Sequence, residues 1–138
     1  MKKDELFKYQ PEAMQLLTRA YEKKKLVHAY LLDGEIGTGT VEAGIYMAKQ
    51  LICKSDHAPC FTCSDCIRID NHSHLSYMYI EPIGDLIKKE QIEHLIHEFS
   101  MSSLESDVQV YIIKDADKMN SAAAVSYTHL RAHETGRN

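Results

Sequence analysis

The sequence predicts an α/β fold in which helices flank a mainly parallel sheet. Three observations predict it. Apolar runs of strand length alternate with amphipathic helices, a glycine-rich turn joins the first strand to a helix, and the composition is that of an ordinary globular chain. The 138 residues include 44% hydrophobic and 26% charged residues. This balance suits one domain with a buried core and excludes wholesale disorder.

The expected helices and strands follow one another in a regular order. Apolar residues recur at three- and four-residue steps in residues 10–25 and 88–101, and residues 41–52 are mostly apolar, so we expect all three segments to be helices. Continuous apolar runs predict three buried strands: residues 27–32, 77–80 and 108–113. Strands that alternate with helices in this way predict parallel pairing.

The turn at residues 34–41 has the outline of a phosphate-binding loop, G-x-x-x-x-G-K-[ST], without its chemistry. Gly34, Gly37 and Gly39 keep the frame, but Thr40 replaces the lysine and Val41 replaces the hydroxyl that holds Mg²⁺. Hydrogen bonds to charged groups contribute roughly 1.5–3 kcal/mol each. We therefore expect ATP binding to be weakened by roughly a hundredfold or more, which leaves it doubtful.

The end of the third strand carries a second defect. Nucleotide hydrolases place an acidic residue there to position Mg²⁺ and water. In this chain Lys114 comes first and Asp115 follows it, and a lysine in that position repels the ion. The two defects together predict a nucleotide-binding fold that does not hydrolyse nucleotide, so no residue is expected to be catalytic.

All four cysteines of the chain form one C-x6-C-x2-C-x2-C segment: Cys53, Cys60, Cys63 and Cys66. Four thiolates at such spacing predict a structural zinc site, closed to water and therefore not catalytic. A set of reduced thiols and an iron–sulfur cluster remain as alternatives. The nearby histidines are expected to be surface residues: His57, His72 and His74.

Charge and hydropathy limit the possible partners. The net charge of −4 and the pI near 6.0 argue against DNA binding by bulk electrostatics. No apolar run approaches the ~20 residues of a membrane span. We expect a cytoplasmic protein with no membrane partner.

Taken together, the motifs resemble the zinc-bearing clamp-loader subunits of bacterial DNA polymerase III, in the AAA+ family. The similarity covers residues of about 6 to 123 and rests on five segments besides the glycine loop: residues 10–11, 28–34, 53–66, 87–92 and 110–119. It implies an AAA+ RecA-like P-loop domain with the zinc module, residues 53–66, inserted after a helix. Thr40, Val41 and Lys114 match the non-hydrolysing member of the family.

The resemblance also implies partners. Such a subunit joins a ring with clamp-loader ATPase subunits and the delta subunit, and meets the sliding clamp and primer-template DNA through that complex. The arginine that the family lends to a neighbouring ATP site lies outside this chain. Two other functions stay open: an active P-loop ATPase of the clamp-loader type, and a zinc-ribbon module that binds nucleic acid or protein.

The last residues depart from the family pattern. Residues 1–123 are expected to be the N-terminal part of the AAA+ domain, and residues 124–138 a non-native tail from truncated or frame-shifted coding sequence. A genuine divergent helix is the alternative. If the later strands of the sheet are missing, the domain is incomplete and its strand edges are exposed.

Overall fold

A computed structural model describes residues 3–25, 30, 32, 39–101 and 108–136. The chain divides into two compact units, residues 1–71 and 72–138. The strand expected over residues 27–32 lies largely outside the described residues, and neither Tyr30 nor Leu32 belongs to a strand. Gly34 and Gly37 also lie outside them.

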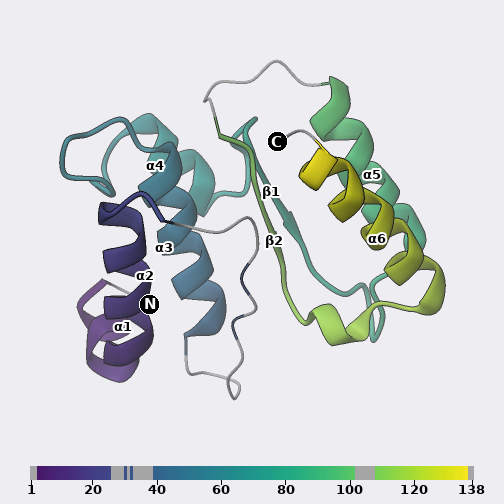
Figure 1. The fold of residues 1–138 in the computed structure, drawn as a ribbon, viewed down its shortest axis with the longest axis horizontal. Helices are drawn as coiled ribbons and strands as arrows, with labels where there is room; N and C mark the ends of the chain where they lie inside the picture. Colours follow the sequence, from purple (N-terminus) through teal and green to yellow (C-terminus); the bar gives the residue numbers. More distant parts are fainter. Residues whose placement is uncertain (1–2, 26–29, 31, 33–38, 102–107, 137–138) are drawn as a thin grey trace. The chain divides into compact units, whose positions relative to one another are not determined.

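In its described residues, the first unit has helices joined by loops and no strand (Figure 1). Its helices are α1 (Lys3–Tyr9), α2 (Pro11–Glu22), α3 (Thr40–Ile52) and α4 (Ser64–Asp70). Pro11 begins α2, where its fixed φ and missing N–H carry no cost. Helices α1, α2 and α3 meet at a small apolar cluster of buried side chains: Leu6, Met14, Ala43 and Tyr46.

The second unit is a two-stranded parallel sheet covered by helices. Strand β1 (Tyr77–Ile80) pairs with β2 (Val110–Ile113), with Tyr77 opposite Val110 and Ile80 opposite Ile113. Helix α5 (Lys89–Met101) lies between the strands in sequence. The short 3-10 turn η1 (Ala116–Lys118) and α6 (Ser121–Gly136) follow β2. In Figure 1, α5 and α6 run side by side next to the strands. Their shared core consists of Ile80, Ile87, Ile92, Leu95 and Ala123.

A separate parallel bridge joins the segments that follow β1 and β2. Ile87 forms a parallel bridge with Met119, because its N–H donates to Lys118 O at 2.9 Å and its carbonyl accepts from Asn120 N–H at 3.1 Å. Ile87 is fully buried. Asn120 then caps α6, since its Oδ1 accepts from Ala123 N–H at 2.8 Å. The segments that begin α5 and α6 are thus fixed to each other.

The described residues confirm an α/β chain with parallel pairing, and the expected strands at 77–80 and 108–113 occur, the latter shortened to Val110–Ile113. The three expected helices occur as α2, α3 and α5. The apolar face expected within residues 10–25 differs in two positions, because Ala13 is exposed and Leu16 is 68% exposed, while Met14 is buried in their place. None of the described helices is both long and apolar enough to cross a membrane.

Helix α6 crosses the predicted boundary between residues 123 and 124 without a break. Ala123 is buried, and Tyr127 packs against the core of the second unit. The helix therefore gains tertiary contacts on both sides of that boundary. The assignment of residues 124–138 as a non-native tail stays a prediction.

Candidate metal centre

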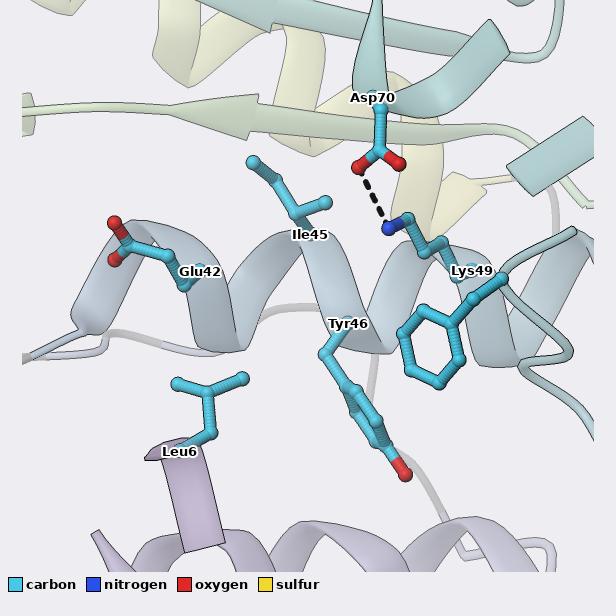
Figure 2. A pocket seen from close by; sticks show the side chains of 7 residues that line it. Leu6, Glu42, Ile45, Tyr46, Lys49 and Asp70 are labelled. Carbon is cyan, nitrogen blue, oxygen red and sulfur yellow. Dashed lines mark ion pairs between the residues drawn. The ribbon is translucent and has the colours of Figure 1, made fainter. Parts of the chain in front are cut away.

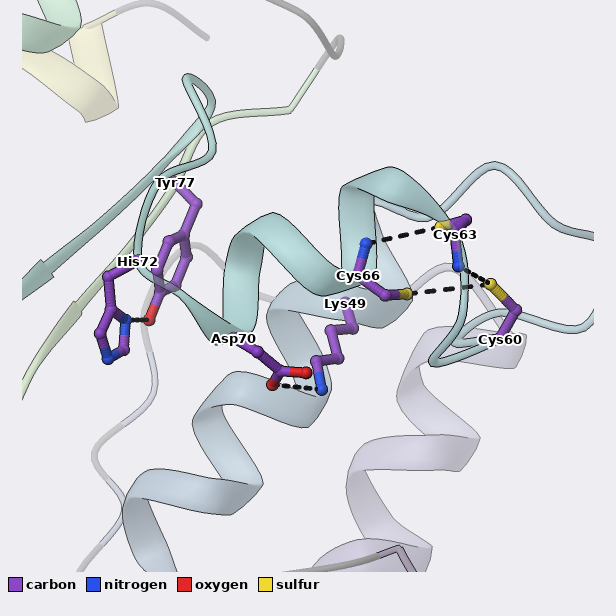
Figure 3. A network of polar contacts seen from close by, with 7 residues as sticks. All are labelled: Lys49, Cys60, Cys63, Cys66, Asp70, His72 and Tyr77. Atoms are coloured by element: carbon purple, nitrogen blue, oxygen red, sulfur yellow. Dashed lines mark hydrogen bonds and ion pairs between the residues drawn. The ribbon is translucent and has the colours of Figure 1, made fainter.

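The cysteine segment connects α3 to α4 within the first unit. Helix α3 ends at Ile52, and the N–H of Cys53 still donates to Lys49 O at 2.8 Å, so the first cysteine is held at the helix end. Cys63 is the N-cap of α4, and Cys66 lies in its first turn. Three of the four cysteines are therefore fixed at helix ends, and Cys60 lies within the loop. Figure 3 shows Cys60 beside Cys63 and Cys66.

The four sulfur atoms have the spacing of a tetrahedral site. All four lie within 4.8 Å of one another. Cys53 Sγ is 3.8 Å from Cys63 Sγ, and Cys60 Sγ is 4.0 Å from Cys66 Sγ. Sulfurs bound at ~2.3 Å to a central Zn²⁺ are about 3.8 Å apart. These separations also exclude disulfide bonds, which need about 2.05 Å. The arrangement can hold a metal ion.

Backbone N–H groups point at two of the sulfurs. Cys63 N–H donates to Cys60 Sγ at 3.3 Å, and Cys66 N–H donates to Cys63 Sγ at 3.4 Å. In the metal-free chain, hydrogen bonds from the backbone of Thr62 and of Cys63 lower the pKa of Cys60 to about 6. Burial raises the pKa of Cys66 to about 12. The two backbone N–H donors stabilise the thiolate form of the sulfurs that they contact, and thiolate is the form of cysteine that binds a metal ion.

Burial divides the four cysteines into two pairs. Cys53 and Cys66 are buried, whereas Cys60 and Cys63 are partly exposed. Each of the two close sulfur pairs joins one buried and one partly exposed cysteine. With four protein sulfurs, a tetrahedral ion has no position left for water or substrate, which is the pattern of structural rather than catalytic sites.

A buried lysine fastens the cysteine segment to α3. Lys49 is 6% exposed, and its Nζ lies 2.6 Å from Asp70 Oδ1 at the end of α4. The same Nζ lies 5.0 Å from the ring centre of Phe61, which follows Cys60. Phe61 adopts a left-handed backbone with φ of 66°, which is uncommon for a bulky residue. Figures 2 and 3 show the ion pair bridging the two helices.

Sequence reasoning missed this contact. Lysine between apolar helix positions is normally read as a solvent-facing residue, and Asp70 lies 21 positions further along the chain. A small pocket of about 120 Å³ adjoins the ion pair, lined on α3 by Glu42, Ile45 and Tyr46 (Figure 2).

The expectation of surface histidines was correct for His57 and His72 and wrong for His74. His74 is 3% exposed, and its Nδ1 accepts from Ser76 N–H at 3.0 Å, an arrangement that pattern reasoning could not anticipate. His72 is exposed, stacks on Tyr79 with ring centres 4.2 Å apart, and contacts Tyr77 Oη through Nδ1 at 3.0 Å. Both belong to the second unit, so neither is part of the described cysteine cluster.

The described part of the glycine loop forms the start of α3. Gly39 is its N-cap in a left-handed conformation with φ of 92°, which glycine adopts without strain, and no side chain caps the helix. Thr40 and Val41 occupy the first turn and are partly buried. These residues keep the turn geometry, but they offer neither a cation nor a metal-binding hydroxyl at the position of Val41.

The residues that follow β2 continue the sheet pairing. Lys114 N–H donates to Ile80 O at 2.8 Å, which extends the ladder by one residue. Asp115 then turns the chain with a left-handed φ of 53° and is exposed. The first residue past the strand is thus a partly buried lysine rather than a carboxylate.

The chain is similar to known proteins over most of its length. The family model described as DNA polymerase III, delta subunit, matches residues 9–127. The chain is 42% identical over 123 residues to DNA polymerase III subunit delta' of Bacillus subtilis, which covers 88% of this chain and 37% of that protein. It is also 31% identical over 110 residues to Protein STICHEL-like 3 of Arabidopsis thaliana, which covers 78% of this chain and 10% of that protein.

Proposed function

The chain belongs to the DNA polymerase III delta subunit family, and from this premise we propose that it serves DNA replication as a clamp-loader subunit that does not hydrolyse nucleotide. The observation that carries the proposal is the 42% identity over 123 residues to the delta' subunit of Bacillus subtilis. The parallel β1–β2 pair and the helix that follows the glycine turn are compatible with an AAA+ P-loop domain.

The chain spans 37% of the length of that relative. Its partners in the proposal are those of a clamp-loader ring: the ATPase subunits, the delta subunit, and through them the sliding clamp and primer-template DNA. A cytoplasmic location accompanies a role in bacterial replication.

The absence of hydrolysis is argued from Thr40, Val41 and Lys114. Charge stabilisation by lysine and Mg²⁺ supplies most of phosphoryl-transfer catalysis. A first turn of α3 that begins Thr-Val provides neither, and Lys114 places a positive charge where a metal-positioning carboxylate would be needed.

The cysteine cluster is proposed to hold a structural Zn²⁺. The 3.8 Å and 4.0 Å sulfur separations match the about 3.8 Å edge of a zinc tetrahedron, and the two N–H donors favour thiolates. When bound, the ion supplies a cross-link between the end of α3 and the start of α4. The protein's own residues orient the sulfurs and exclude water from the two buried ones.

A chimera tests the clamp-loader role. Residues 9–127 of this chain would replace the matching segment of the Bacillus subtilis delta' subunit, and assembly with the other clamp-loader proteins of that bacterium would be measured by co-purification, followed by clamp-loading assays. We expect assembly and loading within about tenfold of the parent protein. A folded chimera that neither assembles nor loads would overturn the proposal.

Nucleotide titration tests the loss of ATP chemistry. The unmodified chain should bind fluorescent ATP at least a hundredfold more weakly than the double variant Thr40→Lys/Val41→Thr, because the variant restores two hydrogen bonds to charged groups of roughly 1.5–3 kcal/mol each. Micromolar binding together with hydrolysis by the unmodified chain would instead support an active P-loop ATPase.

A further inference from the structure

The four cysteines are arranged as two exposed-to-buried pairs, and this arrangement bears on their reaction with oxidants. Cys60 and Cys63 are partly exposed, while Cys53 and Cys66 are buried. Cys60 Sγ lies 4.0 Å from Cys66 Sγ, and Cys63 Sγ lies 3.8 Å from Cys53 Sγ. Each partly exposed sulfur, which an oxidant can reach, therefore has a buried sulfur within 4.0 Å.

From this geometry we infer that the cysteine cluster is an oxidation site for hydroperoxides, at which two disulfides, Cys60–Cys66 and Cys53–Cys63, form and release the metal ion. The inference rests on the proposed zinc centre and adds a regulation to it. Metal-bound sulfurs are thiolates, which are the nucleophilic form of cysteine. A peroxide that reaches the loop meets Cys60 and Cys63 first.

The chemistry balances with hydrogen peroxide as the oxidant. The Cys60 thiolate attacks one peroxide oxygen, the O–O bond breaks, and a sulfenic acid and hydroxide result. The Cys66 thiolate then attacks the sulfenic sulfur, the S–S bond forms, and a second hydroxide leaves. Cys63 and Cys53 follow the same course. Two peroxide molecules are reduced, four thiolates are oxidised, and the ion loses all four ligands.

The fold around the cluster can retain the product. Cys53 is hydrogen-bonded to the end of α3, and Cys63 caps α4, so a Cys53–Cys63 disulfide joins the same two helix ends that the ion joins. The Lys49–Asp70 ion pair connects α3 and α4 independently of sulfur. Oxidation therefore exchanges one cross-link for another, and it should be reversible with thiol reductant and zinc.

The test uses the zinc-loaded chain and hydrogen peroxide. Zinc content is measured first, because a purified chain without stoichiometric zinc contradicts the proposed metal centre and not the oxidation chemistry. Peroxide is then added while released zinc is followed with a colorimetric chelator, and the linkages are mapped by peptide mass spectrometry. We expect one zinc released per chain at about two equivalents of peroxide, with linkages 60–66 and 53–63, and full recovery with dithiothreitol and zinc.

Two double variants test whether exposure of one sulfur sets the rate of disulfide formation. Each keeps only two thiols, so neither has the four-sulfur metal site. Cys60→Ser/Cys66→Ser retains the exposed-to-buried pair Cys53 and Cys63. Cys60→Ser/Cys63→Ser retains the two buried sulfurs. We expect disulfide formation in the first to be at least tenfold faster. Equal rates, a dominant 60–63 linkage in the native chain, or zinc that stays bound at excess peroxide would each overturn the inference.

Discussion

Lys49 is a charged side chain that the fold buries almost completely, with 6% of its surface exposed. Its ammonium group is compensated by Asp70 Oδ1 at 2.6 Å and by the face of the Phe61 ring at 5.0 Å. A buried charge without its partner is costly, whereas replacing both partners by apolar groups costs little. The ion pair is therefore expected to matter most when only its acidic half is removed.

We predict that Asp70→Asn destabilises the chain by about 1–2 kcal/mol. This cost is smaller than that of breaking a fully buried ion pair, because Asp70 is 51% exposed. Lys49→Met should cost less, since methionine fills similar space without a charge. Urea denaturation followed by circular dichroism measures both. In the double variant Lys49→Met/Asp70→Asn, the effect of Asp70→Asn should largely vanish.

The exposed pair on α5 supplies a matched control. Lys89 Nζ lies 3.3 Å from Glu93 Oε1, and both side chains are about half exposed. Lys89→Met should change the free energy of unfolding by less than about 0.5 kcal/mol, as exposed i,i+4 pairs do. If Asp70→Asn has no larger effect than Lys89→Met, the ion pair does not fasten the cysteine segment.

The cysteine pKa values predict how zinc affinity depends on pH. In the metal-free chain Cys60, with a pKa of about 6, is mostly thiolate at pH 7, whereas Cys66, with a pKa of about 12, keeps its proton. Zinc needs thiolates, so each protonated sulfur releases a proton on binding. As pH falls through about 6, Cys60 also becomes protonated and one more proton must be displaced. Affinity should then decline about tenfold more per pH unit below pH 6 than above it.

Competition with a chelator of known zinc affinity between pH 5 and 8 measures this dependence. The slope of log affinity against pH should steepen by about one near pH 6. A slope that stays constant across the range would show that Cys60 does not titrate there.

Among the secondary-structure elements, α5 begins with a side-chain cap supplied by Gln91 in its first turn. Gln91 Oε1 accepts from Lys88 N–H at 2.9 Å, as the third helical residue does in a capping box. Gln91 Nε2 donates to Glu81 O at 2.7 Å, immediately after β1. One side chain therefore fixes both the start of the helix and its distance from the strand.

Gln91→Ala should lower the free energy of unfolding by about 1 kcal/mol, because both hydrogen bonds are lost at a helix start. The stability of Gln91→Glu should fall between those of the unmodified chain and Gln91→Ala, since a carboxylate still accepts from Lys88 N–H but cannot donate to Glu81 O. His94→Ala, at an exposed position of the same helix, is the control and should change stability by less than about 0.5 kcal/mol. Thermal and urea denaturation compare the three. Equal stability of Gln91→Ala and His94→Ala would refute the capping role.

The sequence predicted the elements whose own periodicity is strong. Helices α2, α3 and α5 and strands β1 and β2 each carry an apolar pattern long enough to read, and the cysteine spacing predicted the cluster that the sulfurs form. Helix α4 was not predicted, because seven residues after Cys63 are too short for a periodic signal and depend on the cysteine N-cap. The burial of Lys49 and His74 depends on partners far from them or on local backbone donors, which no pattern along the chain encodes.

At the scale of the whole molecule, the chain consists of two compact units with separate sources of stability. The described part of the first unit, residues 1–71, has a small apolar cluster and the cysteine site. The second has a sheet, a larger apolar core and the Ile87–Met119 bridge. Because metal binding contributes to folding only where its ligands lie, zinc should stabilise the two units very unequally.

We predict that removing zinc with a strong chelator, in the presence of reductant, raises amide hydrogen exchange in α4 and the last turn of α3 by at least tenfold, while β1, β2 and α5 change less than twofold. The physical reason is that Cys53, Cys63 and Cys66 lie at the ends of α3 and α4, whereas the second unit contributes no cysteine to the site. Hydrogen exchange with mass spectrometry at neutral pH resolves these segments. Gln91→Ala supplies the opposite pattern as a control, with faster exchange in α5 and unchanged exchange in α4. If chelation raised exchange equally in both units, they would unfold as one cooperative body and the cysteine site would stabilise the whole chain.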